Sequence, residues 1–181
     1  KGRRKSVVDR GDRNEESAMN HKEKPLAELT LRKYEKPYRL SGRDLIKKLC
    51  LSIGLLQPAD GRDAVVDVFM SVLKAPEPIS LSDIERYVKV SRKTHNLSMN
   101  GIASSNIRRQ VKRLKDAFIV EKLGSAYRIA EDAPLQELFA EKIEKFYLPV
   151  IVARVKEYCE AVEQERWKHG CIVSEVQKSD E

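Results

Sequence analysis

The chain has 181 residues, with 35 Lys and Arg against 28 Asp and Glu, so its formal net charge is +7 at neutral pH. This length accommodates one domain with appendages, and a composition with 35% charged and 6% aromatic residues argues against a large nucleotide-binding enzyme. No apolar stretch reaches the ~18 residues of a membrane-spanning helix, and the basic start is not followed by an apolar region. The sequence therefore predicts a soluble, cytoplasmic protein with no membrane partner.

The basic residues gather in one part of the chain. Residues 86–115 hold nine Lys and Arg and no carboxylate, whereas residues 131–181 hold seven basic and twelve acidic residues. Such asymmetry predicts that one surface meets a polyanion, because scattered cations would produce no local field. A solvated basic face without a ligand is the alternative.

The N-terminal part begins with sequence that cannot form a core. Residues 1–24 mix charges, lack apolar periodicity and predict a disordered basic tail. Residues 25–43 predict an extended basic arm that leads into the fold. Apolar residues at helical spacing then predict a helix over 42–55, with Ser41 as its N-cap.

Two further helices follow. A wide apolar stripe predicts a helix over 60–74, which is ended by the prolines that follow it. Residues 79–84 predict a short strand or turn that runs into a capped helix over 82–94, with Ser80 or Ser82 at the cap. The polar segment from His95 to Gly101 predicts a turn.

The next predicted helix, 104–116, has two unlike faces. Ile107, Val111 and Leu114 recur at core spacing, Ser104 or Ser105 supplies the expected N-cap, and the remaining face is cationic. Two short β-prone runs within 118–129, separated by Gly-Ser, predict a hairpin directly behind it.

This order of elements, with the run DAFIVEKLGSAYRI after a basic helix, resembles the winged helix-turn-helix of prokaryotic and archaeal transcription regulators. The resemblance covers residues 60–129. It implies a mainly α fold with a small β-hairpin, flanked by an N-terminal helix and C-terminal helices. It also implies double-stranded DNA binding, with 104–116 as the recognition helix and 118–129 as the wing. The turn before 104 is longer than in the simplest members.

The predicted DNA contacts follow from major-groove chemistry, in which Arg pairs with guanine, Asn with adenine, and Lys or Ser with phosphate. On the recognition helix they are Ser104, Ser105, Asn106, Arg108, Arg109, Lys112, Arg113 and Lys115, and outside it they are Arg92, Lys93 and Arg128.

The C-terminal part predicts helical appendages. We divide the chain into a tail (1–24), an arm (25–43), a helix plus winged helix-turn-helix domain (44–130), a helical extension (131–168) and a frayed end (169–181). Apolar stripes on either side of Pro149 predict two helices, or one kinked helix, that form a homodimer through 135–168. Such a dimer would present its recognition helices to half-sites about one DNA turn apart. Folding back against the helix 42–55 is the alternative.

No residue pattern predicts catalysis. The sequence lacks a phosphate-binding glycine loop, a nucleophile elbow and an HExxH motif. Three widely spaced cysteines fit neither a disulfide framework nor a zinc site. We therefore expect no enzyme, no metal and no cofactor. Two hypotheses remain: a dimeric DNA-binding regulator, and a winged-helix module that binds RNA or protein within a ribosome, polymerase or replication assembly.

Overall fold

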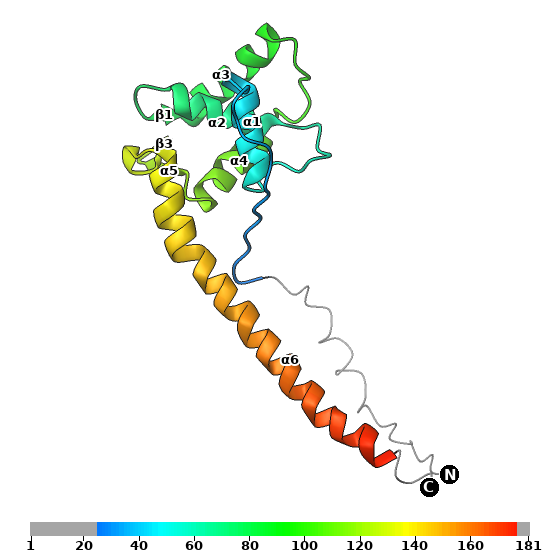
Figure 1. Ribbon diagram of the computed structural model, residues 1–181. Helices are drawn as coiled ribbons and strands as arrows, with labels where there is room; N and C mark the ends of the chain where they lie inside the picture. Colours follow the sequence, from blue (N-terminus) through cyan, green and yellow to red (C-terminus); the bar gives the residue numbers. More distant parts are fainter. Residues whose placement is uncertain (1–24, 177–181) are drawn as a thin grey trace, which may run out of the picture.

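The computed structural model describes the backbone of residues 25–176 and the side chains of residues 25–166. The predicted tail 1–24 lies outside the described residues. The described chain is mainly helical with a small three-stranded antiparallel sheet, which confirms the predicted fold class (Figure 1). A compact region holds the sheet and most helices, and one long helix projects away from it (Figure 1).

The first helix, α1 (Gly42–Ser52), begins after Ser41 as predicted and ends three residues early. It stops because Gly54 takes a left-handed φ of +75°, where a Cβ atom would come within 2.6 Å of Thr30. The arm therefore passes close to the end of α1. Arg32 holds it there: its backbone N–H donates to Ser52 O at 2.8 Å, and its guanidinium donates to Leu51 O at 2.8 Å.

The central helix, α2 (Ala64–Lys74), starts four residues later than predicted. The preceding residues form a turn in which Asp60 accepts hydrogen bonds from the backbone and side chain of Arg62. Nearly all of α2 is buried, with Phe69 fully inaccessible. The next helix, α3 (Leu81–Thr94), is capped by Ser80, whose Oγ accepts the Asp83 N–H, as one of the two predicted caps.

The sheet has the strand order β1-β3-β2, all antiparallel, and joins β1 (Ile79–Ser80), β2 (Val120–Leu123) and β3 (Ala126–Ile129). Of the strand or turn predicted before α3, the structure has a short strand, β1, and the predicted hairpin is confirmed. Gly124 takes a φ of +57° in the hairpin turn, a conformation that favours glycine. A 3₁₀ turn, η2 (Ala130–Asp132), follows β3.

The helix α4 (Ser104–Asp116) has the predicted bounds and buries Ile107, Val111 and Leu114. Its N-cap is Ala103, so the prediction that Ser104 or Ser105 caps it is wrong. The Ser104 hydroxyl is already used, because it donates to Glu85 of α3 at 2.7 Å.

The C-terminal elements α5 (Leu135–Leu138), η3 (Phe139–Tyr147) and α6 (Leu148–Val176) follow one another without a gap and form one continuous rod (Figure 1). Pro149 lies in the first turn of α6, as in the first of the two predicted alternatives, and no gap separates α6 from η3. η3 is a wide π-type segment in which the Leu148 N–H donates to Ile143 O, five residues back. A wide segment before Pro149 is physically reasonable, since proline lacks an N–H and crowds the preceding turn.

The rod touches the compact region only near its beginning. Leu135 packs against the core, Leu138 and Ile143 are buried, and the rings of Phe118 and Tyr147 meet edge to face at 5.6 Å. The rest of α6 extends outward rather than folding back on α1 (Figure 1), and it continues past residue 168, where we predicted the helical extension to end. Within residues 25–176, no helix combines the length and apolarity needed to cross a membrane.

Candidate nucleic-acid interface

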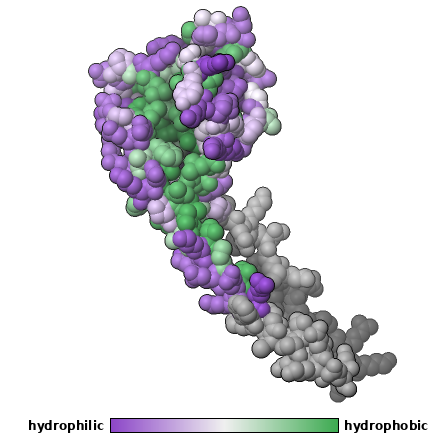
Figure 2. Space-filling view, viewed as in Figure 1, coloured by the Kyte–Doolittle hydropathy of each residue, from purple (hydrophilic) through white to green (hydrophobic). Residues whose placement is uncertain are grey.

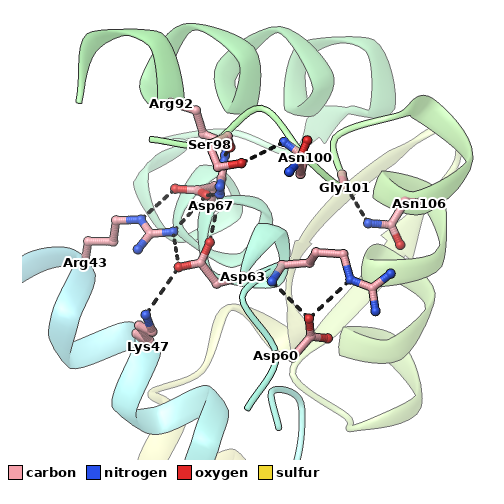
Figure 3. A network of polar contacts seen from close by, with 11 residues as sticks. Arg43, Lys47, Asp60, Asp63, Asp67, Arg92, Ser98, Asn100, Gly101 and Asn106 are labelled. Atoms are coloured by element: carbon pink, nitrogen blue, oxygen red, sulfur yellow. Dashed lines mark hydrogen bonds and ion pairs between the residues drawn. The ribbon is translucent and has the colours of Figure 1, made fainter. Parts of the chain in front are cut away.

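A buried ionic network joins helices α1, α2 and α3 and so holds together the part of the fold that carries α4 (Figure 3). Asp67 of α2 is fully buried and accepts hydrogen bonds from Arg43 of α1 at 3.0 and 3.1 Å. Asp63, the N-cap of α2, pairs with Arg43 at 2.9 Å and with Lys47 at 3.4 Å. Arg92 of α3 bonds to both aspartates, at 3.0 Å to Asp63. Every buried side-chain polar atom in the described part of the chain has a partner.

Arg92 also reaches the loop that leads into α4. Its Nε donates to Ser98 O at 2.6 Å, in the turn between α3 and α4. Only 1% of Arg92 is exposed, so this guanidinium cannot reach a phosphate. The prediction that Arg92 contacts DNA is therefore wrong in this structure. Its role is to position the turn before α4.

A second polar ladder ties one side of α4 to its surroundings. The Asn106 amide donates to Gly101 O and accepts from Gln110 at 2.9 Å. Gln110 in turn accepts from Arg113 at 2.9 Å, and Arg113 donates to Gly54 O at 3.3 Å. Two predicted DNA contacts, Asn106 and Arg113, are thus half-buried and make internal hydrogen bonds.

The opposite face of α4 is exposed and basic. Ser104, Ser105, Arg108, Lys112 and Lys115 are exposed and fall on one side by helical geometry, with Arg109 at its edge. Two of them have partners inside the protein: Ser104 bonds to Glu85, and Lys112 pairs with Asp116 at 2.7 Å.

Exposed cations on the neighbouring helix extend this face. Lys89 and Lys93 lie four residues apart on α3, and the Ser104–Glu85 hydrogen bond joins α3 to the start of α4. We define the cationic surface as the five exposed side chains of this region with no ion pair to any described residue. These are Lys89, Lys93, Arg108, Arg109 and Lys115.

The hairpin contributes less free charge than predicted. Arg128 is half-buried and pairs with Glu121, its register partner across the hairpin, at 2.7 Å. Lys122, which precedes the turn, is exposed. Arg128 therefore stabilises the hairpin, and Lys122 is the hairpin cation that is exposed to solvent.

A polar cavity of about 480 Å³ lies beside α4, lined in part by Arg62, Arg109 and Arg113. Burial lowers the pKa of Arg113, and the charge of Arg109 lowers it further. No carboxylate within the described residues forms an ion pair with Arg113. The cavity thus adds positive potential next to the cationic surface.

Sequence reasoning missed the acidic half of the buried network. The signal was present, since Asp67 interrupts the apolar run of α2 at a position that faces the core. A carboxylate in such a run requires a buried cation, because an unpaired buried charge is costly. The described residues contain no group of three or more His, Cys, Asp or Glu side chains arranged to hold a metal ion.

No family model, no curated protein and no solved structure matches this chain.

Proposed function

We propose that the protein binds double-stranded DNA through α4 and acts as a transcriptional regulator in the cytoplasm. The observation that carries the proposal is the cationic surface: five exposed Lys and Arg side chains without internal ion pairs, on and beside a helix whose other face is firmly buried. Cations that have no carboxylate partner are available to replace the counterions of a phosphate backbone.

The arrangement of elements supports this reading. The order α2, β1, α3, α4, β2, β3 and the antiparallel sheet β1-β3-β2 agree with what the winged helix-turn-helix resemblance implies. In that arrangement an α-helix enters the major groove, which is about 12 Å wide, and the hairpin lies beside it.

The two arginines in the first half of α4 are the candidates for reading bases. Arg108 and Arg109 are exposed and make no ion pair with the described residues, so each has a free guanidinium fork that can pair with guanine O6 and N7. Lys89 and Lys93 of α3, and Lys115 at the end of α4, are placed to hold phosphates. Asn106 supports the helix through its internal hydrogen bonds rather than reading adenine.

The deciding experiment is selection from a randomised duplex pool, followed by fluorescence anisotropy with random duplex and double-stranded RNA as competitors. We expect an enriched site whose binding is weakened about 30-fold or more by Arg108→Ala/Arg109→Ala, since each of the two base contacts contributes about 1–3 kcal/mol. The matched control is Lys74→Ala/Lys145→Ala, which removes two exposed charges elsewhere on the molecule.

Loss of binding in both variants to the same extent would contradict base reading by α4. Equal binding to duplex DNA, RNA and other polyanions, with no enriched site, would reject the regulator. It would favour the alternative of a module within a larger nucleic-acid assembly.

A further inference from the structure

The outer part of the rod carries apolar side chains that nothing covers. Val155, Tyr158 and Val162 of α6 are 55%, 68% and 66% exposed. Figure 2 shows apolar surface running from the compact region onto the beginning of the rod. Contiguous exposed apolar surface of this kind marks an interaction site.

These side chains follow a coiled-coil spacing. Five residues alternate at intervals of three and four, which places them in one narrow stripe along the helix. They are Leu148, Ile151, Val155, Tyr158 and Val162. Val150, which is 61% exposed, falls about a third of a turn away from this stripe.

A helix with an uncovered apolar stripe is not expected to stand alone in water. Most helical stability in proteins comes from packing such an apolar face against a neighbour. Every residue of α6 from 152 to 166 is exposed, so packing against the compact region does not stabilise these outer turns. A second helix with a matching stripe would supply the missing contacts.

The charges along α6 favour a particular orientation of that second helix. Residues 148–156 carry Arg154 and Lys156 and no acid, for a net charge of +2. Residues 157–166 have a net charge of −3. A parallel pair of identical helices would bring the acidic halves together, whereas an antiparallel pair places each basic half beside an acidic half and opposes the helix dipoles.

We propose that α6 pairs with α6 of a second copy of this chain in an antiparallel coiled coil. The stripe fits such a pair with its layers in register. When Val155 of one copy faces Tyr158 of the other, Ile151 faces Val162, so four layers each join two members of the stripe, and Leu148 lies beyond them. The pairing goes beyond the proposed function because it does not require DNA binding.

The oligomeric state measured without DNA tests whether the stripe forms the dimer interface. We expect light scattering and sedimentation to show a dimer for the full chain, a monomer for Val155→Asp, and a dimer for the matched control Val150→Asp. Both valines are exposed within one chain, so neither change disturbs the compact region, and circular dichroism checks this. A monomeric full chain at tens of micromolar, or equal behaviour of the two variants, would overturn the proposal.

Disulfide trapping tests the orientation. In a Cys159→Ser/Cys171→Ser background, we expect an Ile151→Cys chain mixed with a Val162→Cys chain to form a crosslinked heterodimer, while each alone does not. In a parallel pair, each variant alone would crosslink, because a disulfide requires Cα atoms within about 7 Å. Crosslinking of each alone, or of neither alone nor mixed, would overturn the antiparallel pairing. Cys50 does not interfere, since it is buried and burial raises the pKa of its thiol to about 12.

Discussion

In the proposed function, Arg92 serves DNA binding without touching the DNA. It lies among helices α1, α2 and α3 and holds the turn before α4 through Ser98 O. Removing it leaves Asp63 and Asp67 with fewer cations in a buried site. We expect Arg92→Ala to lower the free energy of unfolding by about 3–5 kcal/mol. Lys93→Ala, an exposed neighbour, should change it by less than about 0.5 kcal/mol. Urea denaturation measures both, and similar values would contradict the network's role.

The same network should make the fold sensitive to acid. Burial raises the pKa of Asp63, but hydrogen bonds and charges from Arg43 and Arg92 outweigh it, so the net pKa lies below the ordinary value of 3.8. A lowered native pKa stabilises the fold above about pH 4, and this stability is lost as the pH falls through the native pKa. In Asp63→Asn, the free energy of unfolding measured by urea titration should fall less steeply below pH 4. The exposed change Asp44→Asn serves as the control. If the free energy of unfolding of Asp63→Asn fell as steeply with acid as that of the unchanged protein, the assignment would be contradicted.

At the scale of elements, the sequence predicted both ends of α4 and the position of the hairpin turn, because these features depend on local residue pattern. The function of individual cations was less predictable. Arg92 lies in a basic run, and its acidic partners are 25 and 29 positions earlier, so only the tertiary fold reveals that it is buried. Pro149 is equally compatible with a kink and with the first turn of a helix, which is why local sequence left the continuity of the rod undecided.

The division of labour between α3 and α4 gives a prediction about salt. In the proposed DNA complex Lys89 and Lys93 hold phosphates, so Lys89→Ala/Lys93→Ala should weaken binding to all duplexes about equally. The slope of log K against log salt should become shallower by about 2. Arg108→Ala/Arg109→Ala should instead reduce the preference for the enriched site. Anisotropy at several salt concentrations separates the two effects, and loss of sequence preference in the lysine variant would contradict this assignment.

At the scale of the whole molecule, the orientation of the α6 pair decides the shape of the dimer. In the proposed register, the two Leu138 residues, each buried where a rod begins to pack against its compact region, lie about 37 residues apart along the coil. At about 1.5 Å per residue this is about 55 Å, so the compact regions occupy opposite ends. This separation exceeds the ~34 Å of one DNA turn, which is the half-site spacing predicted for a dimer in the sequence analysis.

Small-angle X-ray scattering of the full chain should therefore give a distance distribution with a second maximum near or beyond about 55 Å. The first maximum arises within each compact region, and the second arises between the two regions. Val155→Asp should abolish the second maximum and Val150→Asp should retain it, because only the first substitution places a charge in the seam. A dimer with a single maximum would indicate that both compact regions lie at one end. That result would require a parallel pair.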